Sequence, residues 1–409
     1  MIHLAVWITL PDARIVNVGE LACTDAEESG RFESEFVYAD EWLAHRQRFA
    51  LDPVSLPLGR GRFRAVKFEP PLAVFEDALP DEWGRRLIIR ARRLPRQEQS
   101  EPFLLRELAA HGLGMGALSF APPGTPPPSR LRMADHDLAE LFAAAESFDA
   151  GGQISSEFLQ RLFAAGSSPG GARPKALLTD ENGEWIAKFP SPQRDGRFDV
   201  VGLEAVGLDL AFAADIAVPD HRLVSLVSTG RRALLVRRFD ITPDGGRRHM
   251  ISLRTLCKER PGAHVQTYTE LAEAVRKVSA SPQDDVNRLF RQMVYNAAFG
   301  NTDDHLKNFW MVHDATGYRL SEAIDLLPDV GERREHCLAF EYGYIAPSRA
   351  ELLAIAGRWG VMRGENAIEA VLASVATFPA VALTRAVPES DISAIAGDLA
   401  QRRMRIQSK

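Results

Sequence analysis

The sequence predicts an α+β protein with a β-rich N-terminal region and a helical C-terminal half. Short, partly alternating apolar runs are concentrated in the first 120 positions, which is typical of strands. A proline-rich stretch follows at 121–130 and indicates a linker. From about residue 250, apolar residues recur at steps of three and four, which is typical of helices. The length of 409 residues fits two or three domains, or one large protein with two lobes.

An N-terminal subdomain is expected over residues 1–120. Its first two strands flank a turn at Pro11 and Asp12, and a third strand carries Phe32, Phe36 and Tyr38 on one face. Two helices follow, and Pro80 with Asp81 could open the first of them. The expected strands are His3–Thr9, Arg14–Leu21 and Phe32–Tyr38, and the expected helices run to Arg93 and over Pro102–Ala110.

Residues 131–240 predict a small lobe that follows the 121–130 linker. A glycine-rich stretch separates a first helix from a β-hairpin with a turn at Asp180–Gly183, and a second helix and two strands come next. This order is typical of the small lobe of a kinase-like fold. The expected elements are a helix at Asp137–Phe148, strands at Lys175–Thr179 and Trp185–Phe189, a helix at Val200–Ala214, and strands at Arg222–Val227 and Arg232–Arg238.

Residues 241–409 predict a helical large lobe. Its clearest helix begins at Ser281, with Pro282 at the first helical position and two acids in the first turn, and it ends at Gly300. Its apolar residues repeat at steps of three and four and predict one buried face.

The composition limits the classes of function. The formal net charge is −6, so bulk electrostatics do not favour nucleic acid or an anionic membrane. The three cysteines are scattered and indicate neither a disulfide framework nor a Cys-x-x-Cys metal site. The first residues lack the pattern of a signal peptide, and no apolar run reaches the roughly 18 to 20 residues that span a membrane. We therefore expect a cytoplasmic protein without membrane contact.

The segment GNTDDHLKNFWMV pairs an acid with an amide. Asp303 is followed five positions later by Asn308, and a second acid, Asp325, comes after the next short strand. Phosphoryl transfer from ATP needs a carboxylate for the attacking hydroxyl, oxygen ligands for Mg²⁺, and a cation near the transferred group. This order predicts Asp303 as the catalytic base and Asn308 and Asp325 as metal ligands. Lys307 would neutralise the γ-phosphate.

The same loop also contains His305 and Asp304. His305 is expected to stiffen the loop through a hydrogen bond, because it lacks the spaced His or Cys partners of a zinc site. The pattern leaves the role of Asp304 open: its carboxylate could bind a second metal, repel the substrate or point to solvent.

The upstream residues complete a nucleotide site. Lys188 stands near the end of an apolar strand, where its ammonium could reach the α- and β-phosphates, and Glu204 in the next helix could pair with it. Gly170 and Gly171 belong to a loop whose backbone N–H groups could cover the phosphates. Phe239, at the end of the last small-lobe strand, is a candidate wall for adenine.

Taken together, these residues resemble the HipA family of type II toxin–antitoxin kinases. The resemblance runs nearly end to end and is carried by LPDEWGRRL, SSPGGARPKALL, WIAKFP, LLVRRFD, GNTDDHLKNF and IDLL. It implies a two-lobed protein-kinase-like fold and a serine/threonine kinase that uses ATP and Mg²⁺. It implies the same roles for the two acids, the amide and Lys188, and it places His305 and Lys307 near the γ-phosphate.

The resemblance also implies regulation and partners. Ser168 matches the loop serine that such kinases autophosphorylate, Ser167 is an alternative, and Pro169 departs from the family pattern. A phosphate adds a charge of about −1.5 to −2, which beside the ATP phosphates would repel the loop from its docked position. Family members are neutralised by a HipB-like helix-turn-helix antitoxin, so DNA is expected only indirectly, through that partner. The implied substrate class is an aminoacyl-tRNA synthetase, the glutamyl enzyme.

Two other functions fit parts of the pattern. A small-molecule phosphotransferase shares the Asp-x-x-x-x-Asn geometry, but the long N-terminal region and the SSPGGARPK loop argue against it. A catalytically inactive subunit, bound to an antitoxin and acting as a co-repressor, is disfavoured because Lys188, Asp303, Asn308 and Asp325 are all intact.

Overall fold

A computed structural model describes the chain from residue 1 to residue 408, except 26, 28–30, 66–71, 112–114, 129–137, 153–172, 192, 227–229, 258–265 and 331–332. The chain divides into two compact units, and it passes from one to the other several times. The first unit comprises Met1–Phe189, Arg237–Pro261 and Val312–Gly317, and the second comprises Pro190–Val236, Gly262–Met311 and Tyr318–Lys409. The expected division at 121–130 and 240 stays a prediction.

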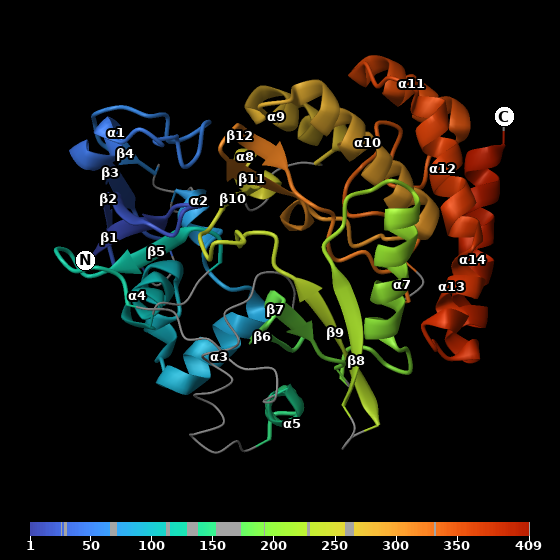
Figure 1. Ribbon diagram of the computed structural model, residues 1–409, viewed down its shortest axis with the longest axis horizontal. Helices are drawn as coiled ribbons and strands as arrows, with labels where there is room; N and C mark the ends of the chain where they lie inside the picture. The colour runs from blue at the N-terminus through green and yellow to red at the C-terminus, as the bar shows by residue number, and fades with distance from the viewer. Residues whose placement is uncertain are drawn as a thin grey trace. The chain divides into compact units, whose positions relative to one another are not determined.

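The first unit contains a five-stranded antiparallel sheet with the strand order β4-β3-β2-β1-β5 (Figure 1). Phe32, Phe36 and Tyr38 are buried, as the predicted face requires. The register of β1 against β2 shifts between Val6 and Trp7. The strands are β1 (Ile2–Thr9), β2 (Ile15–Cys23), β3 (Ser34–Tyr38), β4 (Phe63–Arg64) and β5 (Leu118–Ala121).

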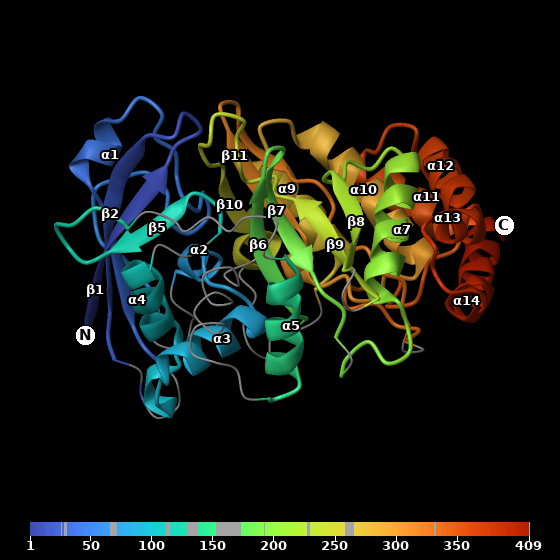
Figure 2. The ribbon, with the colours of Figure 1, turned by 60° about the horizontal axis from the view of Figure 1, so that its bottom comes forward.

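A hairpin in the same unit carries Lys188 at its end. Its strands are β6 (Lys175–Asp180) and β7 (Gly183–Lys188), and their register sets Lys188 opposite Lys175. The helix α5 (Leu138–Asp149) packs along β6 (Figure 2). Trp83, from α3 (Glu82–Arg92), donates its indole N–H to the Lys175 carbonyl at 3.1 Å and lies edge-on to Phe148 of α5. Two helices therefore hold the lysine-bearing hairpin in place.

The remaining elements of the first unit are short, apart from α4, which packs on β1 and β5. They are α1 (Asp40–Ala44), α2 (Ala73–Glu76), η1 (Arg96–Glu98), α4 (Glu101–His111), β10 (His249–Ser252) and α8 (Leu253–Leu256).

The second unit is mainly helical, as the sequence predicts. Three of its strands, β9, β11 and β12, also have residues in the first unit. Its elements are α7 (Val200–Ala213), β8 (His221–Leu226), β9 (Arg231–Arg237), α9 (Tyr268–Val278), α10 (Pro282–Phe299), η3 (Leu306–Asn308), β11 (Trp310–Asp314), β12 (Gly317–Leu320), α11 (Arg349–Trp359), α12 (Gly364–Ala376), α13 (Phe378–Thr384) and α14 (Glu389–Gln407).

The helix α10 is the centre of this unit. It packs against α7, α9, α12 and α14, and its predicted apolar face is fully buried (Figure 1). Ser281 precedes it, Pro282 opens it, and Gly300 ends it with a φ of 70°, a left-handed conformation that glycine adopts without strain. The bounds of α10 confirm the prediction, and they place the catalytic segment directly after a rigid, buried helix.

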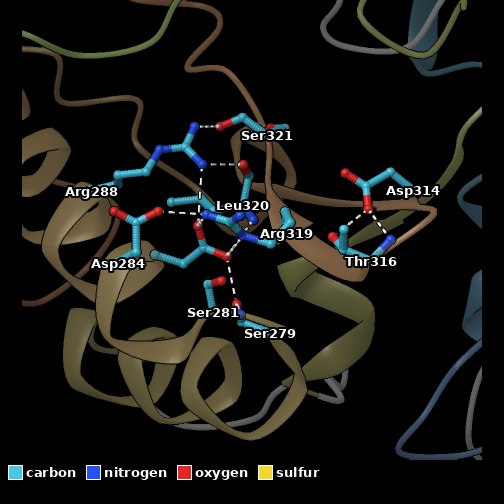
Figure 3. A network of polar contacts seen from close by, with 10 residues as sticks. Ser279, Ser281, Asp284, Arg288, Asp314, Thr316, Arg319, Leu320 and Ser321 are labelled. Carbon is cyan, nitrogen blue, oxygen red and sulfur yellow. Dashed lines mark hydrogen bonds and ion pairs between the residues drawn. The ribbon is translucent and has the colours of Figure 1, made fainter.

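A polar network at the start of α10 fixes the strand that leads to Asp325 (Figure 3). The buried carboxylate of Asp285 accepts hydrogen bonds from Arg319 Nε at 3.0 Å, Ser279 Oγ at 2.6 Å and the Leu320 amide at 2.9 Å. Burial alone would raise the pKa of Asp285, but the bonds from Arg319 and Ser279 outweigh it and lower that pKa. An ion pair from Arg319 and a hydrogen bond from the Leu320 amide therefore attach residues 319–320 to α10.

The observed architecture confirms the predicted α+β class with a β-rich N-terminal region and a helical C-terminal part. Among the described residues, no single helix is both long and apolar enough to cross a membrane. One bent pair, α12 with α13 at 50°, passes the same length and composition test.

Candidate active site

The predicted catalytic segment begins where α10 ends. The backbone N–H of Asn301 turns back to the Asn296 carbonyl at 3.0 Å, and its side-chain amide donates to Asn296 Oδ1 at 3.2 Å. Asn301 and Thr302 are both buried. The first residues of the segment are therefore held against the end of the helix, and this fixes the position of the backbone at Asp303.

The carboxylate of Asp303 points outward. Its side chain is 67% exposed, and its nearest polar partners are Arg333 Nη1 and Cys337 Sγ, each 3.7 Å from Asp303 Oδ1. Both contacts are long, so they leave the carboxylate able to accept a new hydrogen bond from a substrate hydroxyl. An exposed carboxylate can come within hydrogen-bond reach of a substrate hydroxyl, which is the geometric condition for a general base.

The side chain of Asn308 is buried and oriented by the same loop. Its amide nitrogen donates to the Asp303 carbonyl at 2.8 Å, and its backbone N–H bonds to the His305 carbonyl at 2.9 Å. Because the amide nitrogen is engaged in this way, the amide oxygen is the atom that could face a cation. An amide oxygen is a suitable ligand for Mg²⁺.

His305 and Lys307 belong to a loop that contains a single turn of 3₁₀-helix, η3. His305 immediately precedes that turn, with extended backbone angles, and its carbonyl closes the turn as described above. Lys307 lies within the turn and is half-buried. The structure thus confirms that both belong to the rigid loop, and their roles toward a phosphate stay predictions.

Asp325 has a strained backbone. Its φ of 53° lies in the left-handed region, which a residue with a Cβ rarely adopts, and such residues cluster at functional sites. The chain around it is fixed at three points. The Ala323 amide donates to the Ala217 carbonyl, and the Asp329 amide donates to the Gly300 carbonyl, each at 2.8 Å. The Leu326 carbonyl packs against α7. The bond from Asp329 to Gly300 ties the Asp325 loop to the start of the catalytic segment.

The helix α7 supports this loop through a glycine. A Cβ built on Gly207 would lie 2.1 Å from the Leu326 carbonyl oxygen and 2.9 Å from the ring of Phe299. Only a residue without a side chain permits this approach. Glu204, one turn earlier on α7, is buried.

The donor set fits Mg²⁺ better than a transition metal. Among the described residues, no three His, Cys, Asp or Glu side chains come together as a metal site. Mg²⁺ does not need such a cage, because it binds through one or two carboxylates, substrate phosphates and water. Asn308 and Asp325 belong to one unit, joined through the Gly300 region, and would supply oxygen ligands of the kind that Mg²⁺ prefers.

The structure gives Asp304 a position that the sequence left open. Its carboxylate is fully buried and accepts hydrogen bonds from the Tyr268 hydroxyl at 2.5 Å and His336 Nδ1 at 2.9 Å. The backbone amides of Cys337 and Leu338 donate to its other oxygen at 2.9 and 3.3 Å. Burial and the charge of Asp304 raise the pKa of Tyr268 well above its ordinary value. Asp304 therefore points into the protein, not to solvent.

Cys337 also belongs to these surroundings. Burial, followed by the charges of Asp303 and Asp304, raises the pKa of its thiol to about 11. The thiol is therefore protonated at neutral pH and can donate to the Asp303 carboxylate.

The predicted nucleotide residues Lys188, Glu204 and Phe239 are divided between the two units. Lys188 and Phe239 belong to the first unit, whereas Glu204 belongs to the second, so the expected pairing of Lys188 with Glu204 stays a prediction. The glycine-rich loop lies outside the described residues, and with it Ser167, Ser168, Gly170 and Gly171.

Phe239 stands between two buried charges that sequence reasoning did not identify. Arg238 donates to Asp240 through Nε at 3.0 Å and Nη2 at 2.6 Å, and to Glu184 at 3.1 Å. Burial would lower the pKa of Arg238, but Asp240 and Glu184 outweigh it and raise that pKa. Asp240 also accepts from the Gly116 amide at 2.9 Å. The backbone that carries Phe239 is thus rigidly held.

Known proteins resemble the chain in both sequence and fold. The family model of the HipA N-terminal domain matches residues 14–121, and that of the HipA-like C-terminal domain matches residues 167–382. Two curated proteins of Sinorhizobium fredii, "Putative kinase Y4mE" and "Putative kinase Y4dM", are each 29% identical over 154 and 160 residues. These matches cover 36% of this chain and 34% and 38% of the relatives, about a third of their length.

A solved structure matches along the whole chain. It is HipA of Shewanella oneidensis MR-1, determined in a complex with HipB and its operator DNA. The TM-score is 0.69 over 99% of this chain and 96% of that one, at 18% sequence identity. Identity at this level shows the fold alone, and it confirms the predicted two-lobed, kinase-like fold of a HipA protein. Since the C-terminal family model by itself covers more than half of the residues and the N-terminal model covers most of the remainder, the chain belongs to the HipA family.

Proposed function

We propose that this chain is an ATP-dependent serine/threonine protein kinase and the toxin of a type II toxin–antitoxin pair. The observation that carries the proposal is that one loop presents two different groups, a carboxylate and an amide oxygen. Asp303 projects an exposed carboxylate, while Asn308, bonded to the Asp303 carbonyl, can turn its oxygen to a cation. The strained Asp325 lies four residues before Asp329, whose backbone amide donates to the Gly300 carbonyl at the start of the same loop.

In this proposal each residue has a distinct chemical task. Asp303 orients the hydroxyl of the substrate and accepts its proton as that oxygen bonds to the γ-phosphorus, while the bond from the γ-phosphorus to the bridging oxygen breaks and ADP leaves. Asn308 and Asp325 would hold Mg²⁺, and a bound Mg²⁺ would neutralise charge on the phosphates. Lys307 stabilises the charge of the transferred group, and Lys188 binds the phosphates that remain on the nucleotide.

The proposal includes control by self-phosphorylation and by a partner. Ser168, or else Ser167, receives a phosphate, and its added charge displaces the glycine-rich loop. A HipB-like helix-turn-helix protein is the proposed antitoxin, supported by the fold shared with a HipA that was solved together with HipB and operator DNA. The net charge of −6 agrees with a protein that contacts DNA only through such a partner. A glutamyl-tRNA synthetase is the proposed substrate.

A mass measurement tests the proposal. The purified protein is incubated with Mg²⁺-ATP, and phosphate is located by intact mass and peptide mapping in wild type, Asp303→Ala and Asp325→Ala. We expect a phosphate on Ser168 or Ser167 in wild type and in neither variant. Transfer to small alcohols alone would instead indicate a small-molecule phosphotransferase, and failure to bind ATP would indicate an inactive co-repressor.

A growth assay tests the toxin role separately. Expression of wild type without its antitoxin is expected to arrest growth, while Asp303→Ala allows it. Equal growth of both strains would contradict a toxin function even if the kinase activity were present.

A further inference from the structure

A short segment after Asp325 faces the catalytic base. Residues 333–338, here called the facing segment, bring Arg333 and Cys337 to 3.7 Å from Asp303 Oδ1. The Arg333 guanidinium and the Cys337 thiol are both donors. A hydroxyl that approaches Asp303 must therefore come in beside these two groups, and the position of the facing segment decides the direction of approach.

Asp304 holds the C-terminal part of the facing segment. Both of its oxygens are used, one by Tyr268 and the His336 ring, the other by the amides of Cys337 and Leu338. Its neighbour in sequence is the catalytic base, so a single peptide unit joins the exposed carboxylate to the buried one. A shift of the facing segment is thereby transmitted directly to the loop that carries Asp303.

Arg402, from α14, holds the N-terminal part. Its side chain is buried, forms an ion pair with Asp398 at 2.6 Å, and donates to the Arg333 carbonyl at 3.3 Å. The same side chain lies against Gly300, where a Cβ would be 2.9 Å from Arg402 Nε. Arg402 therefore contacts both the facing segment and the first residue of the catalytic loop.

The ring of His336 joins the two anchors. Its Nδ1 lies 2.9 Å from the Asp304 carboxylate. Because an ionised carboxylate only accepts hydrogen bonds, Nδ1 carries the proton. Its Nε2 lies 3.4 Å from Arg402 Nη1, a donor, so Nε2 accepts in the neutral ring. The partners thus assign one tautomer, with a chain of hydrogen bonds from Arg402 through His336 to Asp304.

We propose that Asp304 is a positioning residue: together with His336 and Arg402 it fixes the facing segment against Asp303, and so sets where the substrate hydroxyl docks. The inference rests on the proposed kinase function, and it concerns the hydroxyl side of the reaction only. Asn308 and Asp325, the proposed metal ligands, do not contact Asp304 in any of these bonds. Loss of Asp304 should therefore slow phosphoryl transfer without weakening the binding of ATP.

The test measures the rate of phosphate incorporation, by intact mass, as a function of ATP concentration with Mg²⁺-ATP as the only ligand. Asp304→Ala is expected to lower the rate at saturating ATP on the order of a hundredfold, the typical effect of a displacement near 1 Å, with the half-saturating ATP concentration unchanged. Asp304→Asn keeps an oxygen for the Cys337 and Leu338 amides, so it should recover part of the rate. Amide hydrogen exchange should quicken at Cys337 and Leu338 in Asp304→Ala.

Asp52→Ala is the matched control. Asp52 is also a buried carboxylate that accepts hydrogen bonds from two backbone amides, those of Val54 and Ser55 at 2.8 and 3.1 Å, but it belongs to the first unit, whereas Asp303 and Asp304 belong to the second. This variant should lower stability and leave the rate at saturating ATP unchanged.

The outcomes separate the two proposals. A wild-type protein that transfers no phosphate overturns the proposed function itself. An active wild type with an equally fast Asp304→Ala, or a loss of rate in Asp52→Ala as large as in Asp304→Ala, overturns the positioning role. If Asp304→Ala does not fold, His336→Ala serves instead: it removes the link to Arg402, and a wild-type rate in that variant contradicts the proposal.

Discussion

Replacing Gly207 by alanine should displace the loop that carries Asp325. Gly207 lies within α7, where a Cβ would stand 2.1 Å from the Leu326 carbonyl oxygen, whereas real Cβ contacts essentially never fall below 3.0 Å. The carbonyl must therefore retreat by about 0.9 Å, and the ring of Phe299, at 2.9 Å, blocks relief on that side. Asp325 is the residue next to Leu326, already at a φ of 53°.

The expected cost is large for so small a change. Inserting a methyl group into a well-packed site typically costs about 1–3 kcal/mol of stability, and a shift near 1 Å at a reacting group lowers the rate on the order of a hundredfold. Gly207→Ala should show both effects, with a higher Mg²⁺ concentration needed for half-maximal phosphate incorporation because Asp325 is a proposed metal ligand.

The control is Gly357→Ala in α11, where a Cβ would meet nothing within 4 Å. An alanine there should raise stability by about 0.4–1 kcal/mol and leave the rate unchanged, because it only restricts the unfolded chain. Urea unfolding and the incorporation assay measure both variants. A Gly207→Ala protein as stable and as active as Gly357→Ala would refute the packing argument.

Further predictions concern pH and the loop glycine. Burial, followed by the charge of Glu101, raises the pKa of Glu76 from 4.5 to about 7. Between these two pH values the folded protein keeps a proton that the unfolded chain has released, so the free energy of unfolding should fall as the pH rises. The loss should be about 3 kcal/mol, at about 1.4 kcal/mol per pH unit. Glu76→Gln should lack that loss in urea unfolding; an identical pH profile would contradict it. Burial lowers the pKa of His313, whose ring stacks on Phe49, to about 4. The free energy of unfolding should therefore fall as the pH drops from about 6.5 to 4, because the unfolded chain binds the proton first. His313→Phe should flatten this decline. Gly300→Ala should be destabilised by about 1 kcal/mol or more, from its φ of 70° and its contact with Arg402, and an unchanged thermal midpoint would count against it.

Local signals in the sequence were enough for most of the elements. The helix α10 has a proline at its start, a glycine at its end and an uninterrupted apolar period, so its bounds could be predicted closely. The catalytic segment follows it directly, and the spacing of Asp303 and Asn308 within one turn of loop is again a local property. These predictions depend on residues that are close in sequence.

The rest depends on residues that are distant in sequence. Asp304 is bonded to Tyr268 and His336, which are 36 and 32 positions away, and no pattern links them. The buried group of Arg238 with Glu184 is similar, with 54 positions between the partners. A single sequence does not indicate which carboxylate of the Asp303–Asp304 pair turns inward, because both are equally polar and adjacent.

The most direct test of the central claim is a crystal structure with Mg²⁺ and a non-hydrolysable ATP analogue. We predict an Mg²⁺ bound by the Asn308 amide oxygen and the Asp325 carboxylate at about 2.0–2.1 Å, with the Asp303 carboxylate unligated and open to a hydroxyl. A nucleotide bound with its metal on other residues, or with Asp303 buried as a third ligand, would contradict it.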